Sequence, residues 1–469
     1  MEDLEFLSIF SSSNGFKMGM VTMLVGMAVS SIFIHRWRQR NVKGPKTWPF
    51  VGAAIEQLMN YDRMHDWLAK LLAESKTVKV PMPFTTYTYI ADPANVEHVL
   101  KTNFNNYPKG EVYHSYMEVL LGDGIFNSDG EMWRKQRKTS SFEFASKNLR
   151  DFSTIVFRDY AMKLSSILCQ ASVGNKVIDM QELLMRMTLD SICKVGFGVE
   201  IGTLAPELPD NHFARAFDTA NIIVTLRFID PLWRIKRFLK VGSEALLDQS
   251  IQVINDFTYS MIHKRKAEIL EAKTSDKNGK IKHDILSRFV ELSENPDSNL
   301  TDKSLRDVVL NFVIAGRDTT ATTLSWFVYT MIVNPHVADK LYCYLKDFEE
   351  DQAKEEKVSL APYDPEDPKS FAERLAQFAS LLTYDSLGKL SYLHAAITET
   401  LRLYPAVPQA GPRICLGKDS AYLQMKMALA ILCRFFNFHL VPNHPVKYRM
   451  MTILSMQHGL KLTVTRRSA

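Results

Sequence analysis

The chain has 469 residues, an apolar content of 46% and a formal net charge of +5. This size allows a large buried core, and length alone favours roughly three domains. Much of the basic excess lies in one cluster, which argues against nucleic-acid binding. The five cysteines include no C-x-x-C pair, and their odd number argues against a disulfide framework and fits a reducing compartment.

The first structural signal is an uncharged apolar run from Met18 to Ile34. A helix over this run measures about 26 Å, slightly less than a hydrocarbon core of ~30 Å. We therefore expect a transmembrane anchor at 18–34, preceded by a lumenal N-terminus at 1–17. A cleaved signal peptide is the alternative, but neither a basic n-region nor a small-residue cleavage site is clear.

A basic and proline-containing segment, 35–50, follows this run. Its cations should keep the rest of the chain in the cytosol, because positive residues stay on the cytoplasmic side. Pro45 and Pro49 stiffen the segment into a hinge, since proline fixes φ. We expect an endoplasmic reticulum membrane protein whose residues 51–469 form the cytosolic domain.

The remaining sequence predicts a mainly α fold with small β-sheets. Short strands are expected near 77–90 and 461–465. The polar stretches 273–283 and 349–386 are expected to be loops, and the length of the second indicates mobility or a short internal helix. Apolar periodicity predicts helices at 93–103, 130–138, 150–170, 180–196, 243–272, 302–333, 336–348, 389–403 and 418–436.

The expected helix 130–138 carries the first candidate site. Trp133 and Arg137 lie four residues apart and so share one face. Arginine binds carboxylates bidentately and tryptophan donates one hydrogen bond, so the pair could hold a carboxylate. A basic amphipathic helix without a ligand explains the same residues equally well.

The second candidate lies in the apolar helix 302–333, at A-G-R-D-T-T. Gly316 removes side-chain bulk, so something flat could approach the helix. Thr319 can donate to the Ala315 carbonyl and bend the helix. Asp318 and Thr319 place an acid beside a hydroxyl, which suits proton delivery. A buried helix with satisfied hydroxyls is the alternative.

The third candidate joins two nearby motifs. Glu399 and Arg402 form an i,i+3 pair, which by itself is typical of a surface ion pair. Cys415 follows thirteen residues later, between Gly411 and Gly417. The glycines permit turns whose N–H groups point at the sulfur, and the following helix adds its positive end. Cys415 is therefore a candidate metal ligand, although an ordinary buried cysteine is the alternative.

Taken together and in this order, the motifs resemble those of the cytochrome P-450 family of haem-thiolate monooxygenases, along nearly the whole chain. The resemblance implies the cytochrome P-450 fold and haem b, with Cys415 as the axial thiolate to the iron. Further roles implied are propionate contacts by Arg413, Trp133 and Arg137, oxygen activation by Asp318 and Thr319, and support of the haem core by Glu399 and Arg402.

Other stretches narrow the resemblance to plant fatty acid ω-hydroxylases, most closely to those linked to pollen-wall and anther-cuticle lipid. These are L-G-D-G-I-F-N at 121–127, F-E-F at 142–144 and T-L-D-S-I-C at 188–193. The resemblance implies hydroxylation of a long-chain fatty acid at or near the ω carbon. It also implies electrons from an NADPH-cytochrome reductase, contact with membrane lipid, and no nucleic acid.

The chain departs from the family between Arg402 and Cys415. The family has a longer segment there and an aromatic residue where Pro408 stands, so we expect a segment to be missing near 408–410. The absent segment normally closes a network with Glu399 and Arg402, and an unmatched buried charge is costly. A haem-deficient, non-catalytic product is therefore the alternative to the enzyme, and a membrane protein unrelated to haem leaves the motifs unexplained.

Overall fold

A computed structural model describes residues 2–468, with gaps at 42, 84, 275–283, 296–299, 409–412 and 414; of 2–19, 21 and 143 it describes the backbone alone. The chain divides into two compact units. The first comprises 1–104 with 229–231, and the second comprises 105–228 with 232–469. Each unit is described by itself below.

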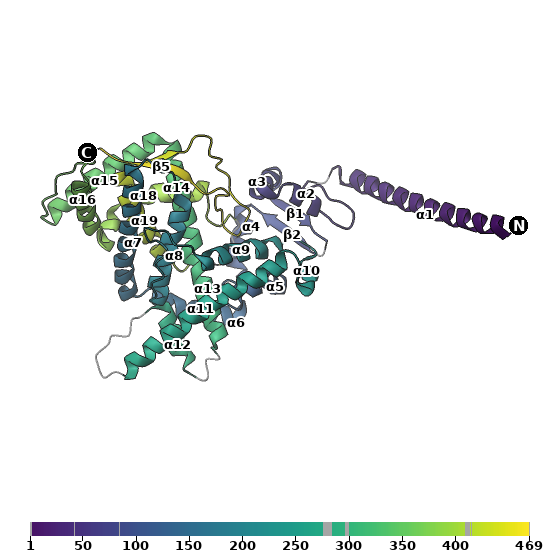
Figure 1. Ribbon diagram of the computed structural model, residues 1–469, viewed down its shortest axis with the longest axis horizontal. Helices are drawn as coiled ribbons and strands as arrows, with labels where there is room; N and C mark the ends of the chain where they lie inside the picture. Colours follow the sequence, from purple (N-terminus) through teal and green to yellow (C-terminus); the bar gives the residue numbers. More distant parts are fainter. Residues whose placement is uncertain are drawn as a thin grey trace. The chain divides into compact units, whose positions relative to one another are not determined.

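The first unit contains helices and one hairpin (Figure 1). Strands β1 and β2 pair antiparallel, with Thr77 opposite Ile90, and confirm the strands predicted near 77–90. Val78 and Val80 are buried because alternate residues of a strand face the same side. The elements are α1 (Glu2–Gln39), α2 (Ala54–Met59), η1 (Tyr61–Arg63), α3 (Met64–Glu74), β1 (Thr77–Pro81), β2 (Thr86–Ile90), α4 (Pro93–Glu97), η2 (His98–Thr102) and η3 (Phe104–Asn106), the last of which runs on into the second unit.

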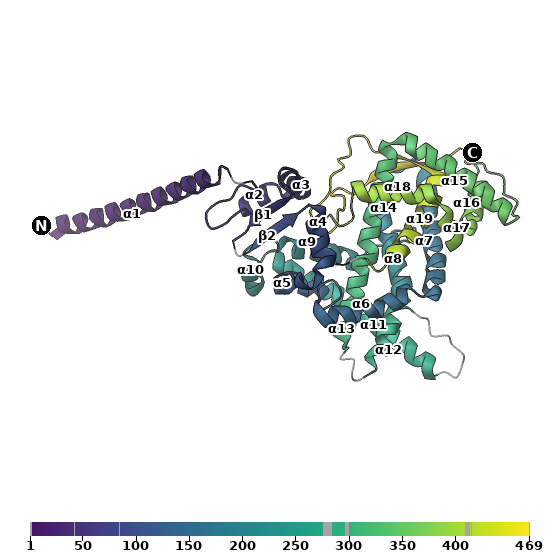
Figure 2. The same cartoon turned by 180° about the vertical axis from the view of Figure 1, so that it is seen from behind.

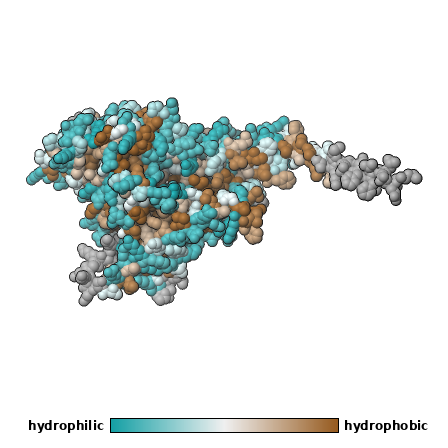
Figure 3. All heavy atoms as spheres, in the orientation of Figure 1, coloured by the Kyte–Doolittle hydropathy of each residue, from teal (hydrophilic) through white to brown (hydrophobic). Residues whose placement is uncertain are grey.

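Helix α1 contains the predicted anchor, 18–34, within one continuous helix. Its described apolar side chains are exposed and pack against little other protein; Phe33, for example, is 72% exposed. Brown, apolar side chains mark this part of α1 in Figure 3. Across the residues that the structure describes, no helix combines the length and the apolar character needed to cross a membrane.

The second unit is mainly helical, with a small antiparallel sheet in the order β3-β5-β4. Strand β5 confirms the strand predicted at 461–465. The elements are α5 (Gly110–Leu121), α6 (Gly130–Phe144), α7 (Lys147–Val173), β3 (Ile178–Asp179), α8 (Met180–Phe197), α9 (His212–Leu226), α10 (Trp233–Leu239), α11 (Ser243–Thr274), α12 (Ile285–Ser293), α13 (Asp302–Val313), η5 (Ile314–Asp318), α14 (Thr319–Val333), α15 (Pro335–Glu355), α16 (Pro368–Leu381), α17 (Tyr384–Lys389), α18 (Ser391–Leu403), α19 (Lys418–Phe435), β4 (Phe436–Leu440) and β5 (Lys461–Arg466).

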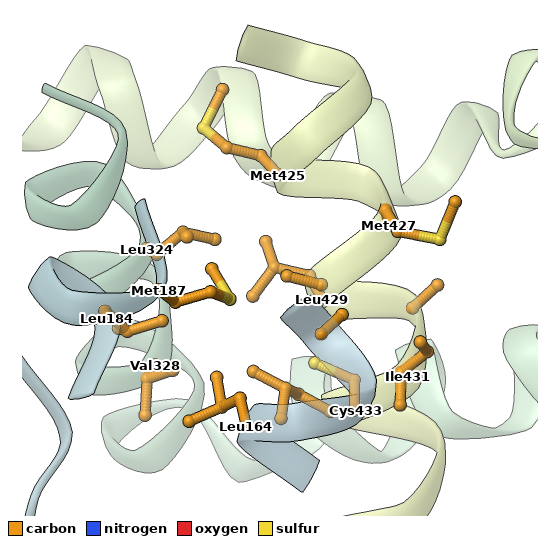
Figure 4. Packing of buried hydrophobic residues seen from close by; sticks show 14 of the residues in the cluster. Leu164, Leu184, Met187, Leu324, Val328, Met425, Met427, Leu429, Ile431 and Cys433 are labelled. Carbon is orange, nitrogen blue, oxygen red and sulfur yellow. The ribbon is translucent and has the colours of Figure 1, made fainter. Parts of the chain in front are cut away.

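The core of this unit lies where α7, α8, α14 and α19 pack together. Leu164, Met187, Leu324 and Leu429, one from each helix, point toward one another in Figure 4 and are each at most 1% exposed. Burying such side chains contributes about 1.5–3 kcal/mol each. Helix α19 is thus fixed by its apolar side chains, and Cys415 lies three residues before its first residue, Lys418.

The predicted single helix 302–333 is interrupted by a π-helical turn at Ile314–Asp318. Side chains satisfy carbonyls at this interruption: Thr319 donates to the Ala315 carbonyl at 2.7 Å, and Thr188 of α8 donates to the Arg317 carbonyl at 3.0 Å. The predicted bond from Thr319 to the Ala315 carbonyl is thus confirmed, at a point where the helix is distorted by a π turn.

The prediction of a loop over 349–386 is wrong for most of its length, but the internal helix that its length indicated is present as α16. Helix α15 continues to Glu355, and α16 and α17 follow, beside α15 and α19 in both views (Figure 2). Asp367 accepts hydrogen bonds from two backbone N–H groups and Pro368 opens α16, so the proline begins a helix here instead of preventing one. Of the other predicted loop, 275–283 lie outside the described residues.

Candidate functional site

The start of α6 and the segment before α19 bring three candidate residues together. Arg137 lies with its guanidinium carbon 5.5 Å from the centre of the Trp133 ring, and Arg413 lies 4.7 Å from the same ring. Trp133 and Arg137 are four residues apart on one helix, as predicted. The tertiary fold adds Arg413 to them from a distant part of the chain.

Arg413 has protein partners of its own. It forms an ion pair with Asp129 and donates from Nη1 to the Ile125 carbonyl at 3.1 Å. The Asp129 carboxylate also accepts from the backbone N–H groups of Lys109 and Gly110. Arg413 is therefore held by a carboxylate of this chain, a partner that sequence reasoning did not identify.

The surroundings of Asp129 carry an excess of positive charge. Lys109 and Arg413 both act on this carboxylate, and the charge of Arg137 acts in turn on Arg413. Burial, and then repulsion from Arg413, lowers the pKa of Lys109 to about 8. The Nε of Arg413 is buried and has no hydrogen-bond partner in the described part of the chain. The cluster therefore favours a further anionic group.

Cys415 lies just before α19, and its side chain is exposed. Enough protein surrounds the sulfur that desolvation raises the pKa of the thiol. The Gly417 N–H, bonded to the sulfur, and the nearby Arg137 act in the opposite direction. The prediction that a glycine N–H points at the sulfur is confirmed for Gly417, whereas Gly411 lies outside the described residues.

Gly417 is also a point of close packing. A Cβ added there would lie 3.3 Å from the ring of Phe144, the last residue of α6. A side chain at Gly417 would therefore be tight against α6, so the loop before α19 lies close to the helix that carries Arg137.

Asp318 and Thr319 are adjacent but have different environments. Asp318 is buried, whereas Thr319 is half-buried. Desolvation raises the pKa of Asp318 well above its usual range; its ion pair with Arg317 opposes this change, and the carboxylate of Asp218 reinforces it. An acid that is easily protonated therefore stands beside a hydroxyl.

Gly316 does not provide the open surface that the sequence predicted. A Cβ at Gly316 would lie 2.7 Å from Cδ1 of Ile192 on α8. The space beside this glycine is filled by another helix, so the interpretation that a flat group approaches the helix at Gly316 is wrong. The glycine instead lets α8 and the π turn pack closely.

Glu399 and Arg402 form a bidentate ion pair on α18, with distances of 2.8 and 2.7 Å. Their side chains are 55% and 67% exposed, respectively. The expectation of a costly unmatched buried charge is therefore wrong, because water and the partner residue satisfy both groups. Glu399 and Arg402 therefore form a surface ion pair and share no hydrogen bond with the described residues around Arg413.

The residues that the resemblance assigns to haem differ in how well their geometry suits that group. An exposed thiol with a backbone N–H on its sulfur can ligate iron, and a cationic excess with an unpaired Arg413 Nε–H can donate hydrogen bonds to a carboxylate. Cys415, Arg413, Trp133 and Arg137 therefore fit the cofactor. Glu399 and Arg402 contribute no donor to this cluster.

Sequence reasoning missed four residues of the site: Asp129, Lys109, Arg317 and Asp218. The position of Arg317, directly before Asp318, was a usable signal, because a charged residue inside an apolar helix needs a partner. Asp129 and Asp218 had no such signal, since their partners are distant in sequence.

The chain is similar to known proteins over most of its length. The model of the family "Cytochrome P450" matches residues 42–410. Cytochrome P450 704B1 of Arabidopsis thaliana is 64% identical over 524 residues, which cover 96% of this chain and 100% of the relative. Cytochrome P450 704C1 of Pinus taeda is 39% identical, covering 93% of this chain and 94% of the relative.

Solved structures agree on the fold. The crystal structure of a cytochrome P450, CYP102L1, matches with a TM-score of 0.68 at 16% sequence identity. The match covers 86% of this chain and 98% of the CYP102L1 chain. The heme domain of a cytochrome P450DA mutant matches with the same TM-score at 17% sequence identity. This match covers 91% of this chain and 97% of the heme-domain chain. The match of 524 residues to the Arabidopsis relative exceeds the 469 residues of this chain, so that relative has residues that this chain lacks.

Proposed function

Because this chain belongs to the cytochrome P450 family of haem-dependent monooxygenases, we propose that it hydroxylates long-chain fatty acids at or near the ω carbon. The convergence of Cys415, Arg413, Arg137 and Trp133 in one unit supports the enzyme. The choice of substrate rests on the stretches 121–127, 142–144 and 188–193, which resemble plant fatty acid ω-hydroxylases.

Four residues would hold the cofactor. Cys415 would ligate the iron, and Arg413, Arg137 and Trp133 would bind propionates through charge and hydrogen bonding. A haem bound through a thiolate supplies the electron density that favours O–O cleavage. The positive charge of Arg137 near the sulfur stabilises the thiolate form of Cys415.

Asp318 and Thr319 would deliver protons. The Thr319 hydroxyl donates to the Ala315 carbonyl, which fixes the position of its oxygen. The raised pKa of Asp318 allows this carboxyl to hold a proton near neutral pH and release it. Replacing Thr319 with alanine should raise peroxide release per NADPH consumed, without a comparable change in substrate affinity.

Electrons would come from an NADPH-cytochrome reductase, and the chain would be attached to the endoplasmic reticulum through residues 18–34. The exposed apolar side chains of α1 and the basic residues in its last turn support membrane attachment with the second unit in the cytosol. Protease added to sealed microsomes should digest the chain beyond residue 50, whereas full protection would reverse the topology.

The deciding experiment is incubation of the full chain with reductase, NADPH and fatty acids of different chain length in microsomes. Hydroxylation at or near the ω carbon would support the proposal. A normal ferrous–CO spectrum without a hydroxylated fatty acid would show that fatty acids are not the substrate. The absence of both the spectrum and the product would support the haem-deficient alternative.

A further inference from the structure

Arg317 is a buried cation shared by two carboxylates. Its Nη1 donates to Oδ1 of Asp218 at 2.7 Å and to Oδ1 of Asp318 at 3.0 Å, and its Nη2 donates to Oδ2 of Asp218 at 3.3 Å. Asp218 lies on α9, whereas Arg317 and Asp318 lie in the π turn. One guanidinium therefore serves acids from two elements.

The two acids differ in their access to water. The side chain of Asp218 is 46% exposed, and that of Asp318 is 2% exposed. Because water stabilises an ionised carboxylate, a proton taken up by this cluster goes to Asp318. The Oδ2 of Asp318 is buried and has no hydrogen-bond partner among the residues that the structure places. This oxygen is available to carry the proton.

We infer that Asp218 and Arg317 are positioning residues for Asp318: Asp218 turns the guanidinium toward α9 and so prevents the complete ion pair that would keep Asp318 ionised. The inference rests on the proposed function, in which Asp318 supplies a proton. Arginine remains charged at every working pH, so the division of its hydrogen bonds decides how strongly it stabilises the Asp318 carboxylate.

The other charged and polar groups near Arg317 keep their identity when Asp218 is replaced. Glu182 and Cys193 of α8 face the guanidinium, and Thr188 of α8 donates to the Arg317 carbonyl. Removing the charge of Asp218 then has two effects of the same sign. It removes a negative neighbour of Asp318, and it frees Arg317 to pair with Asp318 alone; both lower the pKa of Asp318.

The test measures the protonation of Asp318 in the full chain. The infrared band of the protonated carboxyl is titrated as the difference between each protein and the same protein carrying Asp318→Asn. Asp218→Asn should move the midpoint down by about 1 pH unit. Asp218→Glu keeps the charge and should restore the wild-type midpoint. Asp210→Asn is the matched control, because Asp210 is a half-exposed acid that pairs with Arg215 beside the same helix.

A second measurement follows the oxygen chemistry of the haem-loaded enzyme. Asp218→Asn should release several-fold more peroxide per NADPH at neutral pH, and the pH at which coupling is lost should fall together with the infrared midpoint. An Asp218→Asn midpoint equal to that of the wild type would overturn the inference. A shifted midpoint in a protein that makes no fatty acid product would support this positioning role and reject only the proposed substrate.

Discussion

At the scale of single residues, Cys415 and Asp318 show how the environment sets reactivity. Cys193 and Cys433 are buried, and burial raises the pKa of both thiols. Cys415 also has a raised pKa, but a backbone N–H and the charge of Arg137 favour its thiolate. An arginine also favours the thiolate of each buried cysteine, so the backbone N–H on the sulfur and the exposure of Cys415 are what distinguish the candidate iron ligand.

We predict that Cys415→Ser abolishes the thiolate Soret band of the ferrous–CO complex. Serine has no thiolate to donate to iron, so the axial bond is lost. Cys343→Ser is the matched control, because Cys343 is a second exposed, free cysteine. An unchanged band in the Cys415 variant would refute the assignment.

We predict that Asp318 makes the stability of the fold fall as the pH rises. The folded state holds the Asp318 proton more tightly than the unfolded chain, in which an aspartate has a pKa of about 3.9. Between these two pKa values the folded state binds more protons, so the free energy of unfolding decreases with pH and levels off above the raised pKa.

Asp318→Asn should remove this decrease, as measured by thermal unfolding between acidic and neutral pH. The exposed Asp385→Asn variant is the control and should keep the wild-type slope. Equal slopes in all three proteins would show that Asp318 does not titrate in this window.

At the scale of elements, a buried charge cluster joins the three helices α15, α16 and α19. Glu349 is 0% exposed and accepts from Arg374 at 2.7 Å and from Arg434 at 2.8 Å. Glu349 falls in the segment that the sequence predicted to be a loop. The cluster helps to explain why this segment is ordered: Glu349 and Arg374 within it are largely buried and paired, a property that average polarity does not reveal.

We predict that Glu349→Gln destabilises the fold by about 3–5 kcal/mol, because the buried Arg434 and the partly buried Arg374 lose their counter-charge. The neighbouring Glu350 is exposed, so Glu350→Gln should change the thermal unfolding midpoint little. Similar midpoints for the two variants would show that the cluster contributes no net stability.

At the scale of the whole molecule, we predict that a segment of the family is missing at the junction near 408–410. The family match ends at residue 410, and the Arabidopsis relative has residues that this chain lacks. Glu399 and Arg402 remain folded on α18 as a solvated pair. The helices on both sides are thus intact, and the effect of the junction should fall on the loop that carries Cys415.

We predict that inserting the segment of the Arabidopsis relative at 408–410 raises haem content per chain several-fold, measured from the ferrous–CO difference spectrum. The added chain would restrict the Cys415 loop and so reduce the entropy lost on binding. A glycine–serine linker of the same length is the control and should give no increase. Equal haem content in the original and restored chains would show that the deletion is tolerated.

The sequence by itself determined the family motifs, the mainly helical class and most of the long helices, because periodicity and motif spacing are local properties. Asn211 caps α9, and Asp367 with Pro368 begins α16, so these missed helices also had local signals. Only the tertiary structure decided which charges meet. Arg317 and Asp218 are 99 residues apart and Arg413 and Asp129 are 284 apart, and long-range pairing depends on how whole helices pack.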